Sequence, residues 1–257
     1  MDFRQLLPQP AERDLDELLD GLELAARAPG DRPYVAVNFV SSADGRVAFK
    51  GRSGALGDDG DHAMFHGLRE RADAVLAGTG TMNTERYGRM LGSAERRARR
   101  TDRGLQSEPL AVTITRSGEV DLEIPLYAEP EARVAIYTGA EIDTSATAAQ
   151  LELVQLVPDE LTPTTVLRHL HAELGVRSVL CEGGPGLFGA MLAEGVVDEL
   201  FLTLAPKLTG GGGAPAITSG PELPEPVELK LAWVLQRNGY LFLRYTLNGG
   251  AGPGDRS

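Results

Sequence analysis

An apolar strand, a glycine turn and the start of a helix follow one another in Val179-Leu180-Cys181-Glu182-Gly183-Gly184-Pro185-Gly186-Leu187-Phe188-Gly189. Backbone amides at such a helix start have no partner within the helix, and the helix dipole favours an anion there. Glycines also let a ligand approach the backbone closely, because they have no Cβ atom. The segment therefore predicts a phosphate or dinucleotide site, although a plain strand-to-helix connection would also favour these glycines.

The glycines of this segment match part of a known fingerprint. Gly184, Gly186 and Gly189 have the spacing G-x-G-x-x-G of Rossmann domains. That fingerprint expects an acidic residue about 20 positions further on, at the end of the next strand. Here the next strand is expected to end near Lys207 without an acid. The sequence therefore argues against a standard Rossmann site.

The rest of the chain supplies the elements of an α/β sheet. Apolar runs bounded by turn residues predict strands, and apolar residues at helical spacing predict helices. Strands that alternate with helices and end in a hairpin predict a mostly parallel central sheet, flanked by helices, with an antiparallel edge. We expect strands at 34–40, 74–77, 110–115, 133–137, 151–156, 176–181 and 199–204, helices at 12–28, 58–71, 163–174 and 185–194, and a C-terminal β-hairpin of 228–236 and 240–247 around Asn238-Gly239.

Composition excludes several classes of protein. A formal charge of −12 over 257 residues argues against a broad nucleic-acid surface. No apolar run approaches the roughly 20 residues that cross a bilayer. Cys181 is the only cysteine, which excludes an intramolecular disulfide and favours a reducing compartment. We therefore expect a cytoplasmic protein that binds a small molecule and neither nucleic acid nor membrane.

The length fits one large domain or two small ones. Without repeats or a convincing linker, the sequence predicts a single domain over 33–248. We expect a helical N-terminal extension over 1–32 and a disordered tail over 249–257.

Three further features are candidates for a site. Gly78-Thr79-Gly80-Thr81 is a second glycine turn after a strand, and two such turns could hold a pyrophosphate-containing cofactor. Glu182 follows an apolar strand, where a carboxylate can donate a proton with a raised pKa, accept a hydrogen bond from a substrate, or cap its own helix. Asp44 has a similar place after the first strand, although Asp44-Gly45 is also a common turn pair.

Histidines and arginines carry weaker signals. His62 and His66 have the spacing of zinc ligands, but no third ligand is evident, so we expect no metal site. A basic run occupies the polar stretch 93–108, where a solvated face is the simpler interpretation and a phosphate or partner role the alternative. Its members are Arg96, Arg97, Arg99, Arg100 and Arg103.

Several of these segments occur in an order that resembles a known family. The segments are Ser42-Ala43-Asp44-Gly45, Gly51-x-Ser53, Arg69, Gly78-Thr79-Gly80-Thr81, Glu182-Gly183-Gly184-Pro185, and Val197-Asp198-Glu199-Leu200 to Ala205-Pro206-Lys207-Leu208. The chain resembles, from about Pro33 to Leu247, the C-terminal reductase domain of the bifunctional riboflavin-biosynthesis deaminase–reductase. That domain has the fold of dihydrofolate reductase.

The resemblance implies an NADPH-dependent oxidoreductase that converts the ribosylamino group of a phosphorylated aminouracil to a ribitylamino group. It implies Asn38, Ser53, Arg69 and Glu182 at the substrate. From their places after apolar strands, we expect Glu182 and Asp44 to be the catalytic carboxylates. Arg116 would face the 2′-phosphate of the cofactor, to which a guanidinium bonds well. The full cofactor set would be Val40, Ala55, Thr81, Glu85, Thr115, Arg116, Ser117, Gly183, Gly184, Pro185, Gly186, Leu187 and Phe188.

The chain departs from the family pattern at two places. An Asp-Asp-Pro-x-Leu-Thr-x-Arg stretch is replaced by Glu85-Arg86-Tyr87-Gly88-Arg89-Met90-Leu91, and a tryptophan is replaced by Ala55. A dihydrofolate or dihydropterin reductase on the same fold, or a non-catalytic NADPH-binding oligomer, therefore remain alternatives. The family and the exposed edge of the C-terminal hairpin also predict a homodimer.

Overall fold

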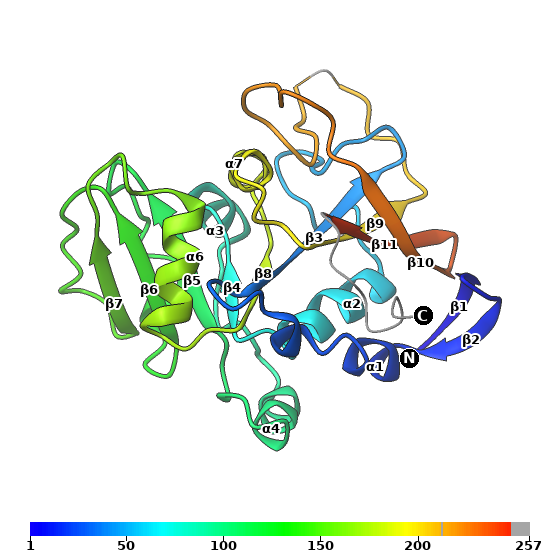
Figure 1. Ribbon diagram of the computed structural model, residues 1–257, viewed down its shortest axis with the longest axis horizontal. Helices are drawn as coiled ribbons and strands as arrows, with labels where there is room; N and C mark the ends of the chain where they lie inside the picture. Colours follow the sequence, from blue (N-terminus) through cyan, green and yellow to red (C-terminus); the bar gives the residue numbers. More distant parts are fainter. Residues whose placement is uncertain (212, 248–257) are drawn as a thin grey trace.

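The computed structural model describes residues 1–211 and 213–247 (Figure 1). In these residues, eleven strands form one sheet with the order β2-β1-β10-β11-β9-β3-β8-β4-β5-β6-β7. The tail predicted for 249–257 lies outside the described residues. The strands are β1 (Asp2–Leu7), β2 (Ala11–Asp14), β3 (Tyr34–Ser42), β4 (Ala74–Leu76), β5 (Leu110–Thr115), β6 (Arg133–Thr138), β7 (Gln150–Gln155), β8 (Ser178–Cys181), β9 (Glu199–Ala205), β10 (Leu229–Arg237) and β11 (Tyr240–Leu247).

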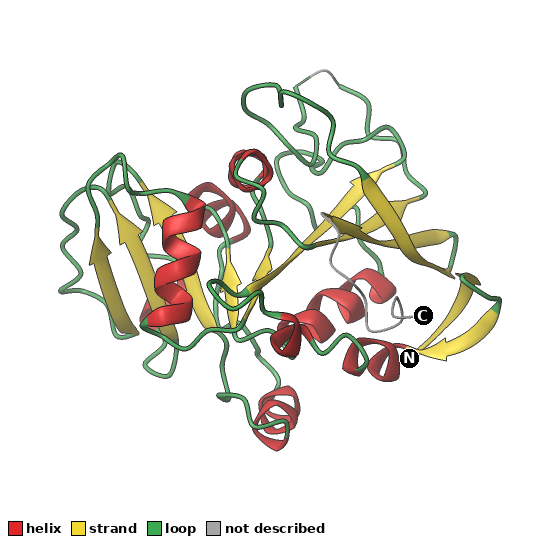
Figure 2. Cartoon of the chain, viewed as in Figure 1, coloured by secondary structure: helices red, strands yellow, loops and turns green. Residues whose placement is uncertain are grey.

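Helices cover both faces of this sheet (Figure 2). Successive strand residues point to opposite faces, so β3 sends Val35 and Val37 into one apolar cluster and Tyr34 and Ala36 into another. Helices α6 and α7 pack on the first face, and α1 and α2 on the second. The helices are α1 (Leu15–Asp20), η1 (Leu24–Arg27), α2 (Asp59–Arg69), α3 (Thr79–Glu85), α4 (Ala94–Asp102), α5 (Pro125–Ala128), α6 (Pro163–Ala172) and α7 (Pro185–Ala193).

The order of the parallel strands creates a switch point. Strand β8 lies between β3 and β4 and pairs in parallel with both. From β4 the chain continues outward to β5, β6 and β7, whereas after β8 it crosses to β9 on the other side of β3. Open α/β sheets bind ligands at the carboxyl ends of strands where such connections diverge. The residues that follow β3, β4 and β8 therefore occupy the expected binding edge.

The mostly parallel sheet with an antiparallel edge is confirmed. The C-terminal hairpin turns at Asn238 and Gly239, whose φ angles of 50° and 83° are those of a type I′ turn. The predicted strands and the helices over α2, α6 and α7 are also present, with ends that differ by a few residues.

The single helix predicted for 12–28 is wrong. These residues complete the hairpin β1–β2 and then form α1 and η1. The Asp14 carboxylate accepts the amides of Asp16 and Glu17 and so starts a helix there. The apolar spacing marks buried residues correctly, since Leu15 and Leu19 face the core.

The N-terminal hairpin also changes the argument for a dimer. Strand β1 pairs antiparallel with β10, and Phe3 packs edge-on against Phe242 at 4.9 Å. The outer edge of the C-terminal hairpin is therefore covered by the chain itself. The prediction of a homodimer now depends on the family resemblance alone, and the division between 1–32 and 33–248 stays a prediction.

The arginine-rich stretch is not simply a solvated face. Arg100 is fully buried and donates from Nη1 to the carbonyls of Arg69 and Ala72, at 2.9 and 2.7 Å. Burial lowers the pKa of Arg100 to about 10. The buried Glu70 carboxylate is held by Arg96 and Arg99. Helix α4 therefore clamps the C-terminal end of α2.

This clamp gives a prediction for stability. Replacing Arg100 by Met leaves two buried carbonyls without donors, each costing about 1–3 kcal/mol. We expect the free energy of unfolding to fall by about 3 kcal/mol in urea denaturation. The exposed Glu95→Gln on the same helix is the control and should change it by less than about 0.5 kcal/mol. Equal stability of Arg100→Met and the wild type would contradict the clamp.

Candidate active site

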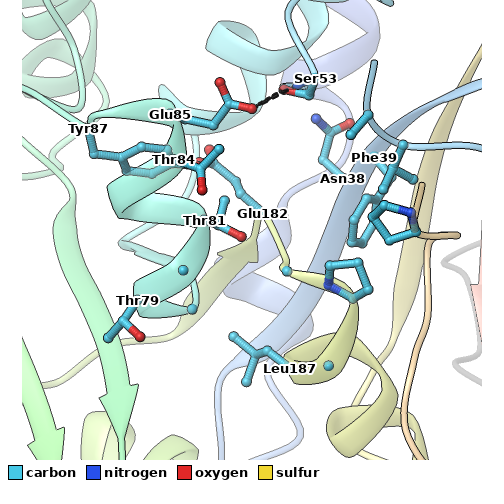
Figure 3. A pocket seen from close by; sticks show the side chains of 18 of the residues that line it. Asn38, Phe39, Ser53, Thr79, Thr81, Thr84, Glu85, Tyr87, Glu182 and Leu187 are labelled. Carbon is cyan, nitrogen blue, oxygen red and sulfur yellow. Dashed lines mark hydrogen bonds between the residues drawn. The ribbon is translucent and has the colours of Figure 1, made fainter. Parts of the chain in front are cut away.

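A cavity of about 890 Å³ opens at the carboxyl ends of β3, β4 and β8 (Figure 3). Ligand pockets span about 300–1,000 Å³, so this cavity has room for a large ligand or for two. Figure 3 shows Thr81, Thr84 and Tyr87 on the α3 side of the cavity and Asn38 and Phe39 on the β3 side. A cavity lined by side chains therefore lies at the switch point of the strand order.

The two glycine turns contact each other at this cavity. The Gly78 amide donates to the Gly183 carbonyl at 2.8 Å. Gly183 has φ +89°, and a Cβ atom there would lie 2.8 Å from the Phe39 ring, so only glycine fits. A Cβ atom on Gly184 would lie 2.8 Å from Thr81 Oγ1, although its φ of −75° is ordinary.

Each glycine turn leads directly into a helix. The turn from Gly78 to Thr81 is the beginning of α3, with Gly78 as N-cap, whereas the sequence suggested an open turn. Helix α7 begins with Pro185 after the N-cap Gly184, which offers no side-chain hydrogen bond to the helix amides. Gly186 and Leu187 of this first turn line the cavity. The start of α7 therefore has the backbone donors and dipole direction that suit a phosphate.

Glu182 is the centre of a buried polar cluster. Its carboxylate accepts from Arg69 Nε and Nη2, at 2.6 and 2.7 Å, and from the Tyr87 hydroxyl at 2.6 Å. Arg69 Nη1 donates to the Met90 carbonyl at 2.9 Å, and the guanidinium lies 4.2 Å from the centre of the Phe65 ring. Both carboxylate oxygens are thus occupied by protein donors.

Charge and burial fix the protonation states in this cluster. Burial alone would lower the pKa of Arg69, but the Glu182 carboxylate outweighs it and the pKa is raised. Burial raises the pKa of Tyr87 well above its ordinary value, and the neighbouring carboxylate adds to the effect. Arg69 therefore stays charged and Tyr87 neutral. The cluster is a rigid support and does not present a free carboxylate to a ligand.

Ser53 and Glu85 join two walls of the cavity. Glu85 Oε1 accepts from both the amide and the hydroxyl of Ser53, each at 2.8 Å (Figure 3). The resemblance implied Ser53 at the substrate and Glu85 at the cofactor. Both line the cavity, but they bond to each other and hold the loop after β3 against the end of α3.

Asn38 presents an unused acceptor. Its side chain lines the cavity, and the residue is only 8% exposed. Within the described part of the chain, Asn38 Oδ1 has no hydrogen-bond partner. Leaving a buried oxygen unpaired costs about 1–3 kcal/mol, so a ligand that donates to it would be stabilised.

Twelve of the predicted site residues line the cavity and six do not. The six are Asp44, Ala55, Thr115, Ser117, Gly183 and Phe188. The twelve are Asn38, Val40, Ser53, Arg69, Thr81, Glu85, Arg116, Glu182, Gly184, Pro185, Gly186 and Leu187.

Three of the residues that do not line the cavity make other contacts in the fold. The Asp44 carboxylate accepts from the Ser42 hydroxyl at 2.6 Å and the Gly210 amide at 2.9 Å, and these bonds lower its pKa to about 2. Asp44 thus holds a loop and is not placed for catalysis. Phe188 is buried against Phe39, with 5.5 Å between ring centres. Ser117 Oγ accepts the Glu119 amide at 3.3 Å in the turn after β5.

Sequence reasoning missed Tyr87, Phe65 and Asp61, which all line the cavity. Tyr87 lies in the stretch that departs from the family pattern. Its aromatic side chain within that polar stretch was the signal that could have indicated a place in the site. Asp61 lies in the first turn of α2, where an acid looks like a helix-start residue. Its burial could not be seen from the sequence.

No helix in residues 1–211 and 213–247 has the length and apolar character of a membrane span. Nor do His, Cys, Asp or Glu side chains of this region gather in threes as metal ligands would.

Comparisons with known proteins identify the family. The profile of the RibD C-terminal domain matches residues 33–240. The 2,5-diamino-6-ribosylamino-4(3H)-pyrimidinone 5′-phosphate reductase of Archaeoglobus fulgidus is 28% identical over 192 residues, which are 74% of this chain and 87% of that protein. The riboflavin biosynthesis protein RibD of Mycobacterium tuberculosis is 30% identical over 181 residues, 70% of this chain but 44% of RibD.

Solved structures agree on the fold. A pyrimidine reductase-like protein from Corynebacterium diphtheriae superposes with a TM-score of 0.72 at 21% identity, covering 91% of this chain and 98% of that one. The dihydrofolate-reductase-like fold expected from the resemblance is thereby confirmed. Because the profile spans most of the chain and the relatives are named reductases, this chain belongs to the RibD C-terminal domain family and is an oxidoreductase of the pyrimidine-reductase type.

Proposed function

We propose that this chain uses NADPH to reduce a ribosylaminopyrimidine 5′-phosphate to its ribitylamino form. The observation that carries the proposal is the hydrogen-bonded pair of glycine turns at one cavity, which the polar cluster of Arg69, Tyr87 and Glu182 also lines. The relatives named for this reaction support it.

The glycine turns fit the phosphates of a dinucleotide. The start of α7 offers backbone amides at Gly186 and Leu187, and Thr81 adds a hydroxyl from α3. Gly184 and Thr81 lie against each other, since a Cβ atom on Gly184 would come within 2.8 Å of Thr81 Oγ1. Arg116 follows β5 at the cavity wall, is exposed, and is the cation we assign to the 2′-phosphate.

The other end of the cavity fits the substrate. Asn38 offers an unpaired oxygen, and the aromatic side chains of Phe65 and Tyr87 line the cavity beside the Arg69 guanidinium. Bound NADPH would supply a hydride. In the reaction, C1′ of the ribose gains that hydride, the C1′–O4′ bond breaks, and O4′ takes a proton. The chain's own task is to hold C1′ in reach of the nicotinamide.

Glu182 acts in this proposal as a positioning residue. Its oxygens are engaged by Arg69 and Tyr87, so it orients the wall that the substrate contacts and does not transfer a proton. Asp44 has no role in the reaction. The homodimer and the cytoplasmic location stay predictions.

The proposed function is tested by NADPH oxidation. The chain is offered ribosylaminopyrimidine 5′-phosphate and, separately, dihydrofolate, and the loss of nicotinamide absorbance is followed. We expect turnover with the pyrimidine and at least a hundredfold lower kcat/KM with dihydrofolate. Turnover with dihydrofolate alone would instead favour the dihydrofolate-type alternative, and turnover with neither would refute the proposal.

The glycine turns give a prediction for cofactor binding. In Gly184→Val the added side chain would press against Thr81 Oγ1, which lies 2.8 Å from the position of a Cβ atom. We expect the Kd for NADPH to rise at least tenfold in calorimetry, with the protein still folded. Gly92→Val is the control, because its Cβ atom would meet no atom within 4 Å. Unchanged affinity in folded Gly184→Val would show that the cofactor binds elsewhere.

Arg116 gives a prediction for cofactor choice. Losing a hydrogen bond to a charged group costs about 1.5–3 kcal/mol, or about 10- to 150-fold in affinity. We expect Arg116→Gln to weaken NADPH binding by that factor and to leave NADH binding unchanged, both measured by calorimetry. If NADPH and NADH lose affinity equally in this variant, Arg116 does not contact the 2′-phosphate.

A further inference from the structure

The turn from Ser53 to Leu56, at the cavity, is held at both of its ends. The Leu56 amide donates to the Ser53 carbonyl at 2.9 Å and closes the turn. At its beginning, Glu85 Oε1 accepts from the Ser53 amide and hydroxyl. At its end, Lys207 Nζ donates to the carbonyls of Ala55 and Leu56, at 2.8 and 3.0 Å. A carboxylate from α3 and an ammonium from the end of β9 therefore hold one turn between them.

The two charges match the backbone groups that they meet. A carboxylate only accepts hydrogen bonds and takes the amide of Ser53, whereas an ammonium only donates and takes carbonyl oxygens. The Gly57 carbonyl, 3.4 Å from Lys207 Nζ, lies on the same side as the other two. Hydrogen bonds with one charged partner are about twice as strong as neutral ones. The turn is therefore fixed by charge-assisted bonds at both ends.

Lys207 has a rigid base for this contact. Its carbonyl accepts the Ala43 amide at 2.9 Å, which ties the backbone after β9 to the backbone after β3. The ammonium lies 5.6 Å from the centre of the Tyr240 ring, within the range of a cation–π contact. Within residues 1–211 and 213–247, Lys207 forms no ion pair with a carboxylate. In this part of the chain, the hydrogen bonds of the ammonium all go to the carbonyls of residues 55–57.

The turn forms part of the cavity wall. Gly51, Ser53 and Gly54 line the cavity, whereas Lys207 does not. The backbone of a glycine adopts many conformations when nothing holds it. A ligand that needs one of these conformations binds more weakly in proportion to the fraction of molecules that adopt it. The contact of Lys207 with the turn therefore affects the affinity for a ligand that Lys207 does not touch.

We propose that Lys207 is a positioning residue for the substrate, because it holds residues 51–57 in the shape that the substrate meets. The turn leads directly into α2, which brings Phe65 and Arg69 to the part of the cavity that the proposed function gives to the substrate. The inference rests on that function. Since Lys207 touches no reacting atom, it acts on the binding of the substrate and not on hydride transfer.

Steady-state kinetics of the full chain test this role. In Lys207→Met the stem of the side chain stays, but the donors to the turn are lost. We expect the KM for the ribosylaminopyrimidine 5′-phosphate to rise about tenfold and kcat to stay within about twofold of wild type, because only the held shape of the wall is lost. Lys207→Arg keeps a cation with several donors and should stay within about threefold of the wild-type KM. An unchanged KM in Lys207→Met would overturn the inference, whatever happens to kcat.

Two control variants separate positioning from stability and from charge. Tyr240→Phe removes the bond of 2.9 Å from the hydroxyl to the Leu56 carbonyl, but it keeps the ring beside Lys207. It should lower the melting temperature and leave the KM unchanged. Lys50→Met removes an exposed charge that does not line the cavity and should also leave the KM unchanged. A rise in KM in either control equal to that in Lys207→Met would overturn the inference.

Hydrogen exchange tests the hold on the turn without any reaction. The amides of Ser53 and Leu56 are both hydrogen-bonded, and exchange requires these bonds to open. By NMR, we expect both amides to exchange about tenfold faster in Lys207→Met and at the wild-type rate in Lys50→Met. Unchanged exchange in folded Lys207→Met overturns the inference even where the reaction proceeds. Absence of turnover by wild type refutes the proposed function instead, while faster exchange in Lys207→Met would still support the hold on the turn.

Discussion

The cavity depends on one buried ion pair, Arg69 with Glu182. The two side chains share two hydrogen bonds of 2.6 and 2.7 Å, and their exposed fractions are 8% and 2%. Removing such charges from water is costly, and the pair is tolerated because each nitrogen of the Arg69 guanidinium donates to an acceptor. Arg69 comes from α2, Glu182 follows β8, and Tyr87 and Met90 come from the segment after α3. The pair thus fixes three segments that are far apart in the sequence.

The surroundings of the pair explain much of the remaining architecture. Arg100 and the Glu70 cluster hold the end of α2 from which Arg69 projects. Directly after Glu182, Gly183 accepts the Gly78 amide, so the wall of the polar cluster continues into the two glycine turns. A displacement of β8 relative to β4 would disturb both ends of the cavity at once. In the proposed function, the binding of two ligands side by side depends on this single arrangement of strands.

Local signals in the sequence predicted the elements well. Apolar runs located the strands, and the glycines after β8 identified the start of α7, because both signals depend on neighbouring residues. The start of α3 at Gly78 was taken for an open turn. Long-range partners were not visible. Arg69 and Glu182 were each assigned to the substrate, but their pairing joins residues 113 positions apart. The helix predicted for 12–28 failed for the same reason, since β2 pairs with β1, and β1 in turn pairs with β10 near the other end of the chain. Arg100 appeared exposed because its carbonyl partners belong to the end of α2 and the segment after α4.

The most direct test of this account is a double-mutant cycle on the central pair. The free energy of unfolding is measured in urea for Arg69→Met, Glu182→Gln, the double variant and the wild type. Each single change leaves a buried partner uncompensated and should cost about 3–5 kcal/mol. We predict that the double variant loses less than the sum of the single losses, by about 2 kcal/mol or more. Additive losses, with a coupling energy near zero, would contradict the claim that this pair holds the cavity together.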